Sequence, residues 1–580
     1  MGQQAKYFYE FGPFRIDSGE RLLRRGTEAI SLTPKAVETL LILLEYKGQI
    51  VEKEVLIKRV WPDTIVEEGN LTQNISLLRK VLEDGPKTPY IKTIARRGYR
   101  FIAPVTEIRK DETGSRSLAV LPLANLSDDP AQEFFAEGMT DELINRLMKI
   151  ETLRVCSRTS AMAYKGVKKP LGQIARELNV DWVVEGAVVH AANRVRIAAR
   201  VIEASSEKHL WAETYERDMR DVLTLQSEVA IAIACEIDVR LTASEQARLS
   251  KSRPVAPGAY EDYLRGRYFL NKRTPEEFGR AVEYFRSAID QDPTYAPAHA
   301  GLADGYALLG SIGYDAMPPR EAMPLAKAAA KSALQLDPTL AEAHASLGYV
   351  KFNYDWDWFG AERELKRSIE LNPNCATGHL WYGEHLMALG RMDEACGQLK
   401  LALDLDPLSI PCNLAVGYYF YVTRDSGQAI RQYRKTLEIA PNVPMVRYEL
   451  GLAYQHKGLY QEALAEFQKA YALSSGESGA VMLLGRAYAL AGQTAEARQS
   501  LASLQETSTR KYVPALYRAF ICAGLNDKDE AFRWFEKAYE DRSNSLIYLA
   551  VEPSFDKLRS DPRFQHLLQK VGLMTAAESC

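Results

Sequence analysis

Residues 70–101 read NLTQNISLLRKVLEDGPKTPYIKTIARRGYRF, and this pattern predicts a helix, a short linker and a tight β-hairpin. Apolar side chains recur in the helical part at helical spacing, so one side of the helix should enter a core. Those side chains are Leu71, Ile75, Leu78 and Leu82. The outward surface then carries amides, hydroxyls and a lysine, namely Asn70, Thr72, Gln73, Asn74, Ser76 and Lys80.

Amides and hydroxyls can read base edges in the DNA major groove, where Gln and Asn pair with adenine. For an isolated helix, a solvated face is the simpler interpretation, but the neighbouring hairpin favours DNA. Two short β segments bracket Ala95-Arg96-Arg97-Gly98, and Gly98 is expected to supply the positive φ of a tight turn. Because adjacent arginines repel one another, Arg96 and Arg97 predict a phosphate contact, to which Lys92 on the preceding strand should add.

The residues before 70 should complete a small domain. From 8 to 32, apolar and polar residues alternate around Gly and Pro turns, which predicts an antiparallel sheet. Thr33-Pro34 predicts a helix start, with a capping hydroxyl followed by proline at the first helical position. A second helix is expected at about 52–60, and a third is expected to begin near Asn70.

Together these features resemble the OmpR/ToxR-type winged-helix DNA-binding domain over about residues 6–105. The matching motifs are FGPFRID, LTPKAVETLLILL, VW at 60–61, NLTQNISLLRKVL and IKTIARRGYRF. The resemblance implies that residues 70–80 form the recognition helix and that Arg96 and Arg97 form the wing. The sequence departs from the family at Glu52, where many relatives have a capping Ser or Thr, and at Ala95, where proline is common.

Charge is distributed unevenly along the 580 residues, which are too many for a single core. Residues 1–105 carry 17 Lys and Arg against 13 Asp and Glu, whereas the remainder carries 56 against 63. A basic module on an acidic body fits an anionic partner held at one end. Seven scattered cysteines without a Cys-x-x-Cys pair predict reduced thiols and no zinc site. No apolar run approaches the ~18 residues that span a bilayer, so we expect a soluble, cytoplasmic protein without a membrane contact.

The middle of the chain predicts a second domain. A polar linker at 106–116 should end the first domain. Residues 117–245 then alternate strand-like and helix-like segments, as in an α/β domain. They resemble the TolB amino-terminal and FlgO-like group, which implies no defined chemistry. One strand carries Arg194, Arg196 and Arg200 on one face, which is either an anion-binding strip or, more simply, a solvated face.

Beyond residue 254 the chain is periodic. Pro338, Pro373, Pro407 and Pro441 stand 35, 34 and 34 residues apart, and this period indicates tetratricopeptide (TPR) helix pairs. About eight repeats are expected within 255–552, the second with an insertion near 313–319, and 553–580 should form a capping tail. Most tyrosines should lie in the inter-repeat core. TPR arrays usually bind peptides or other proteins on a concave surface, so a protein or peptide partner is expected.

The sequence therefore predicts a multidomain chain: an α+β winged helix-turn-helix, a small α/β domain and an all-α TPR solenoid. The leading interpretation is a transcriptional regulator that binds double-stranded DNA sequence-specifically, with dimerisation on DNA, while the other domains receive a signal or bind protein. The alternative is a TPR scaffold whose winged helix binds protein. Catalysis in 117–240 is disfavoured because no Gly-rich phosphate loop, nucleophile elbow or His-Glu-x-x-His motif occurs, so we expect no catalytic residue, cofactor or metal.

Overall fold

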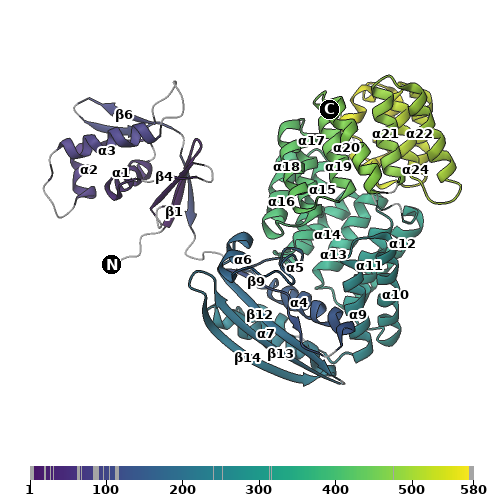
Figure 1. The fold of residues 1–580 in the computed structure, drawn as a ribbon, viewed down its shortest axis with the longest axis horizontal. Coiled ribbons are helices and arrows are strands. Elements are labelled where there is room, and N and C mark those ends of the chain that lie inside the picture. The colour runs from purple at the N-terminus through teal and green to yellow at the C-terminus, as the bar shows by residue number, and fades with distance from the viewer. Residues whose placement is uncertain are drawn as a thin grey trace. The chain divides into compact units, whose positions relative to one another are not determined.

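The chain divides into two compact units, Met1–Ser115 and Arg116–Cys580 (Figure 1). The computed structural model describes residues 6–573 except for short gaps. These gaps are 18–20, 26–27, 31, 47, 62–65, 67, 83–89, 96, 104, 111–115, 128, 192, 240, 251–252, 312–313, 315 and 475.

The amino-terminal unit combines two small antiparallel sheets with three helices. The first sheet has the order β4-β3-β2-β1-β8, formed by β1 (Lys6–Phe11), β2 (Phe14–Asp17), β3 (Leu22–Arg25), β4 (Glu28–Ile30) and β8 (Thr106–Lys110). The second has the order β5-β7-β6, formed by β5 (Ile50–Glu52), β6 (Ile91–Ile94) and β7 (Gly98–Phe101). The helices are α1 (Pro34–Glu45), α2 (Lys53–Val60) and α3 (Glu68–Val81).

The helix starts follow their local chemistry. Thr33 accepts a hydrogen bond at Oγ1 from the backbone N–H of Ala36, 3.3 Å away, and Pro34 opens α1 as expected. Glu52 precedes α2 without a side-chain capping bond, in line with the missing Ser or Thr. All four stripe residues of α3 are buried, each 1% exposed or less, so the predicted inward face is confirmed.

Helix α3 begins at Glu68, close to the expected start near Asn70, with an acidic residue in the first turn that suits the positive helix start. Two other expectations about this unit are wrong. Residues 106–110 belong to strand β8, paired with β1, instead of a linker. Gly98 does not have a positive φ; it lies within β7, where a Cβ atom would stand 1.9 Å from the carbonyl oxygen of Val51 on β5. Close backbone approach, not turn geometry, requires glycine there.

The second unit begins with the predicted α/β domain. Its sheet has the order β11-β9-β12-β13-β14, with β10 also paired to β12. The strands are β9 (Arg116–Val120), β10 (Ala124–Asn125), β11 (Leu153–Val155), β12 (Trp182–Ala191), β13 (Arg194–Glu203) and β14 (Lys208–Asp218). Its helices are α4 (Glu133–Leu147), α5 (Arg158–Met162), α6 (Leu171–Leu178), α7 (Val222–Glu236) and α8 (Ala243–Ser250).

The three arginines of β13 form a solvated, ion-paired strand face. Glu216 lies 2.9 Å from Arg194 and 3.2 Å from Arg196, and Glu185 pairs with Arg200. Each of the three arginines is paired with a glutamate on a neighbouring strand. The strand face is therefore a solvated face, not an anion-binding strip.

Eight helix pairs follow among the residues that the structure describes, in agreement with the TPR period. The first four are α9 (Pro257–Leu270) with α10 (Pro275–Gln291), α11 (Ala296–Leu309) with α12 (Pro319–Leu336), α13 (Ala341–Val350) with α14 (Trp358–Leu371), and α15 (Ala376–Ala388) with α16 (Met392–Leu405). The last four are α17 (Ile410–Val422) with α18 (Ser426–Ile439), α19 (Pro444–His456) with α20 (Tyr460–Leu473), α21 (Ser478–Leu490) with α22 (Thr494–Thr507), and α23 (Ala515–Gly524) with α24 (Lys528–Glu540). In the third pair, α13 continues into a π-helical turn, Lys351–Asp355.

Small residues let the paired helices pack closely. A Cβ atom on Gly451 would stand 2.4 Å from the ring of Phe467, and one on Gly417 would stand 2.2 Å from the ring of Tyr433. Both rings are fully buried. Each glycine therefore makes the space that an aromatic side chain of the partner helix fills.

The α/β domain is bound to the repeats by a continuous core and by buried polar contacts. Arg267 of α9 pairs with Asp141 of α4 at 3.2 Å. Further along the array, the turn residue Asn374 donates from Nδ2 to the carbonyl oxygens of Met148, Ile150 and Leu153, at 3.0, 3.4 and 2.9 Å. Its side chain is 6% exposed.

We expect Asn374→Ala to loosen this contact at a cost of about 2 kcal/mol, because the buried carbonyl groups of Met148 and Leu153 would lose this donor. The carbonyl oxygen of Ile150 would keep its hydrogen bond from the backbone N–H of Leu153. Hydrogen exchange of the full chain should then speed up across 148–153. Asn442 occupies the equivalent turn four helices later and is exposed, so Asn442→Ala is the matched control. If residues 148–153 exchanged at the same rate in the two variants, Asn374 would not stabilise this contact as proposed.

The carboxyl-terminal residues return to much earlier helices. They form short helices at Asn544–Tyr548 and Pro553–Leu558 and helix α25 (Pro562–Val571). Asn544 donates to the carbonyl oxygen of Gly310 at 3.1 Å, and Trp358 Nε1 donates to that of Val571 at 3.0 Å. The tail therefore packs against α14 and the end of α11 as well as against the last repeat.

None of the described helices combines the length and apolarity that a bilayer span requires. Six of the cysteines lie in the described part of the chain, and all six are free thiols.

Candidate nucleic-acid interface

Helix α3 presents a continuous polar stripe on the side opposite its buried residues. Thr72, Gln73, Ser76 and Lys80 are all exposed, and their spacing places them on one face of the helix. The Thr72 hydroxyl donates to the backbone oxygen of Glu68 at 3.1 Å. The amide of Gln73 and the ammonium of Lys80 thus lie on the same exposed face of α3, whose opposite face is packed into the core.

The two asparagines lie on the flank of this stripe. Asn70 is exposed, whereas Asn74 is half-buried and donates from Nδ2 to Thr39 Oγ1 of α1 at 3.2 Å. One donor of the Asn74 amide is therefore committed to fixing α3 on α1. The helix spacing could not show this, because Thr39 is 35 residues away along the chain.

Arg79 joins the helix to the hairpin. Its Nε donates to the carbonyl oxygen of Ile91 at 3.0 Å, and its Nη2 donates to Thr93 Oγ1 at 2.7 Å. Both acceptors lie on β6, which runs beside α3 in Figure 1. A bidentate guanidinium contact of this kind fixes orientation as well as distance, so the hairpin keeps one position relative to the polar stripe.

The hairpin carries cations on its outward face. Lys92 on β6 stands directly opposite Arg100 on β7, and both side chains are exposed. Like charges placed opposite each other across strands are unfavourable unless an anion lies between or above them. Arg97 in the turn is exposed as well, whereas Arg96 lies outside the described residues. Arg100 was not among the predicted site residues, although its position, eight after Lys92 in a short hairpin, could have indicated it.

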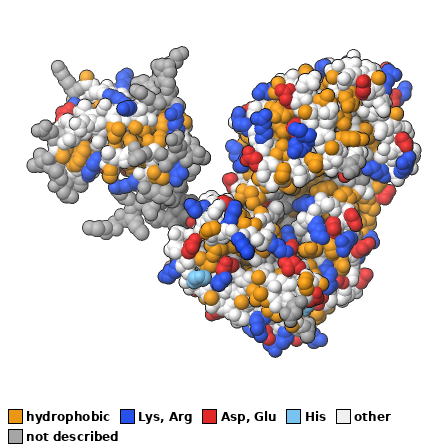
Figure 2. Space-filling model, viewed as in Figure 1, with side chains coloured by type: hydrophobic (Ala, Val, Ile, Leu, Met, Phe, Trp, Pro, Cys, Tyr) orange, Lys and Arg blue, Asp and Glu red, His pale blue; other side chains and the backbone are white. Residues whose placement is uncertain are grey.

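An ion pair anchors the start of helix α3 to α2. Lys53 at the start of α2 contacts Glu68 at the start of α3, and the hydrogen bond that Lys53 donates to the Glu68 carboxylate raises the pKa of Lys53. Figure 2 shows Lys and Arg side chains spread over the visible face of this unit, with few acidic ones among the coloured side chains. The surface therefore suits a polyanion.

Residues 26–101 match the family described as "Transcriptional regulatory protein, C terminal". The amino-terminal unit is a winged-helix domain of this family. Two tetratricopeptide-repeat families match 357–410, 414–478 and 454–517, in the region of the helix pairs.

Curated relatives match this chain over different shares of its length. The transcriptional regulator HilA of Salmonella typhimurium is 25% identical over 429 residues, which cover 73% of this chain and 75% of HilA. The transcriptional activator CadC of Escherichia coli is 32% identical over 103 residues, covering 17% of this chain and 20% of CadC. A putative adenylate cyclase 3 of Rhizobium meliloti is 39% identical over 187 residues, and the chain covers only 32% of its length.

Among solved structures, the DNA-binding domain of Escherichia coli CadC shares 29% identity and aligns over 98% of that domain and 18% of this chain, with a TM-score of 0.17. The solved structure of MamA shares 25% identity over 27% of this chain and 91% of its own, with a TM-score of 0.24.

Proposed function

We propose that this protein is a transcriptional regulator that binds double-stranded DNA with sequence preference through its amino-terminal unit. One observation carries the proposal: Arg79 holds the exposed polar stripe of α3 and the cationic hairpin in a single rigid arrangement. In such an arrangement the helix lies in the major groove and contacts base edges, while the basic hairpin contacts the phosphates of the DNA backbone. The transcriptional regulators among its relatives support this assignment.

Within the interface, the two groups of residues have different roles. We assign base contacts to the stripe of α3 and its flank: Asn70, Thr72, Gln73, Asn74, Ser76 and Lys80. We assign phosphate contacts to Lys92, Arg96, Arg97 and Arg100. Because Asn74 already donates to Thr39, only its remaining amide donor and its oxygen are free for a base.

The wing assignment predicts a salt-dependent loss of affinity. Arg97→Ala together with Arg100→Ala should weaken binding to every duplex and flatten the dependence of log K on log salt by about 0.9 per lost phosphate contact. Mobility shifts of the full chain across a salt series measure both effects. Arg24→Ala, an exposed arginine on β3, is the control. An unchanged salt slope in the double variant would count against the wing.

The stripe assignment predicts altered preference instead of a uniform loss. Gln73→Ala should relax selection at one or two base positions, with a discrimination change of about 1–3 kcal/mol. Selection from a random duplex library with wild type and variant reads this out directly. An identical selected motif from both proteins would contradict a base contact by Gln73.

We further propose that the repeat array binds a protein or peptide, and that two copies assemble side by side on DNA. Sedimentation of the chain with a selected duplex tests the second point, where two copies per duplex is the expected result. We propose no catalytic role: the similarity to the putative adenylate cyclase covers about a third of each chain, and incubation with ATP should yield no cyclic AMP.

A further inference from the structure

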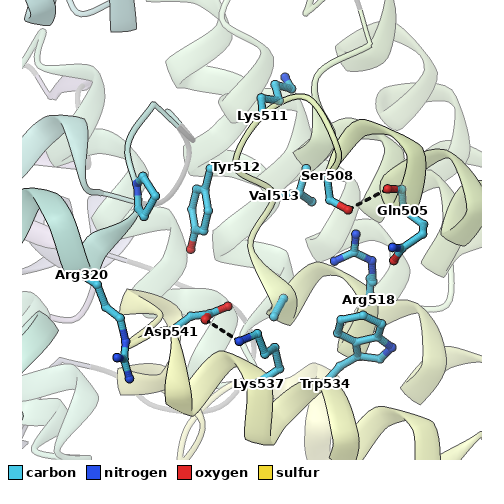
Figure 3. Close-up of a pocket in the computed structure, with 12 residues that line it drawn as sticks. Arg320, Gln505, Ser508, Lys511, Tyr512, Val513, Arg518, Trp534, Lys537 and Asp541 are labelled. Carbon is cyan, nitrogen blue, oxygen red and sulfur yellow. Dashed lines mark hydrogen bonds and ion pairs between the residues drawn. The ribbon is translucent and has the colours of Figure 1, made fainter.

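A cavity of about 400 Å³ opens between distant repeats of the second unit. Figure 3 shows its wall, formed by the start of α12, the segment between α22 and α23, and one face of α24. Such a volume suits a small molecule rather than a folded partner. The site lies far along the chain from the DNA-binding unit and has no part in the function proposed above.

Arg518 of α23 forms the deepest charged part of the wall. Its side chain is 5% exposed, and its guanidinium lies 4.6 Å from the ring centroid of Trp534. Nη2 donates to the carbonyl oxygen of Leu504 at 2.9 Å, but Nε has no hydrogen-bond partner in the part of the chain that the structure describes. Figure 3 shows this group between Ser508 and Trp534, directed into the space that the lining residues enclose.

Among the described residues, no carboxylate compensates the charge of Arg518. Burial lowers the pKa of Arg518, and among the described residues the one titratable group that opposes this effect is the Cys522 thiol. A buried cation without a counterion is costly. Because the ring of Trp534 covers one face of the guanidinium, the N–H donors that Leu504 does not use remain in the guanidinium plane.

The mouth of the cavity adds further positive charge. Arg320, Lys511 and Lys537 line it and are exposed. Asp541 is the one acidic side chain among the described lining residues, and it lies 3.2 Å from Lys537. Four cations and one carboxylate thus line the cavity. Lys537 also lies 3.4 Å from Glu540, outside the lining, whereas Arg518, the most buried of the four cations, has no acidic partner among the described residues.

We propose that this cavity binds a small, multiply charged oxyanion, either a phosphate compound or a di- or tricarboxylate. Arg518 would donate a charge-assisted hydrogen bond to one oxyanion group from the guanidinium hydrogens that Leu504 does not use. Arg320 and Lys511 would hold a second group at the mouth. Since Arg320 belongs to the second repeat and Arg518 to the eighth, a bound anion would link two ends of the array.

Calorimetric titration of the full chain with pyrophosphate and, separately, with citrate tests the proposal and distinguishes the two sources of negative charge. Saturable binding of at least one anion is expected. Arg518→Gln should weaken it by about tenfold or more, the usual effect of losing a charge-assisted hydrogen bond. Absence of saturable binding for both anions would overturn the proposal.

A second variant covers the case in which Arg518→Gln does not fold. Arg320→Ala with Lys511→Ala changes exposed side chains only and should weaken binding by several-fold. Arg510→Ala is the matched control, because Arg510 adjoins Lys511 in sequence, pairs with Glu506 and does not line the cavity. Equal affinities for the double variant and the control would place the anion elsewhere and refute the site.

Discussion

Gly98→Ala should disrupt the second sheet of the DNA-binding unit and abolish DNA binding. A Cβ atom at this position would stand 1.9 Å from the Val51 carbonyl oxygen and 2.9 Å from the Glu52 Cα. Both are backbone atoms, so the clash cannot be relieved by a side-chain movement. Strand β7 would have to separate from β5, and we expect a loss of about 3 kcal/mol.

Hydrogen exchange of the full chain measures this effect, with faster exchange expected at 50–52 and 98–101. Gly69→Ala is the matched control: it lies in the first turn of α3 with nothing within 4 Å of the added Cβ. Because alanine is the better helix former, that variant should be as stable as wild type or more stable by up to about 1 kcal/mol. Wild-type protection in Gly98→Ala would contradict the packing reason for this glycine.

The second unit should lose stability as the pH rises from about 4.5 to about 8. Burial raises the pKa of Glu384 on α15 and of Glu449 on α19 from 4.5 to about 8 each. Between these values the folded state holds the two protons, while the unfolded state has released them. Stability is therefore highest below the unfolded pKa and falls until the folded pKa is passed.

Glu384→Gln and Glu449→Gln each replace one buried carboxyl group by an amide that does not titrate, so the pH dependence of stability should become flatter. The free energy of unfolding should rise by about 2 kcal/mol per variant at pH 8 and change little at pH 4.5. Urea unfolding at several pH values provides the measurement. Glu438→Gln on α18 is the exposed control. His385 acts in the opposite sense, since burial lowers its pKa from 6.5 to about 4, so each variant must be compared with wild type at the same pH. If the free energy of unfolding depended on pH in the same way in wild type and both variants, the two buried carboxyl groups would not be protonated as proposed.

Local patterns were sufficient where a residue's role depends on neighbours along the chain. The buried stripe of α3 and the Thr33 cap follow from spacing within one or two turns, and the helix pairs follow from a period of about 34 residues that repeats along the chain. The three long strands of the α/β domain were also readable, because alternating or continuous apolar runs identify them.

Through-space partners explain the failures. Strand β8 contains one strongly apolar residue, Ile108, and it is a strand because β1 pairs with it. The role of Gly98 depends on Val51, and that of Asn74 depends on Thr39, neither of which a sequence window can place nearby. Likewise the prolines of the repeat turns reveal the period, but not that Asn374 binds the α/β domain.

The return of the carboxyl terminus to earlier helices changes how the array should come apart. An open solenoid frays repeat by repeat from its ends, since each repeat touches only its neighbours. Here Val571 bonds to Trp358, 213 residues earlier, and Glu552 accepts hydrogen bonds from Tyr418 and Tyr421. These hydrogen bonds couple the last helix to the middle repeats. Cleavage of the chain near its carboxyl-terminal end should therefore make the repeats unfold together in one cooperative transition.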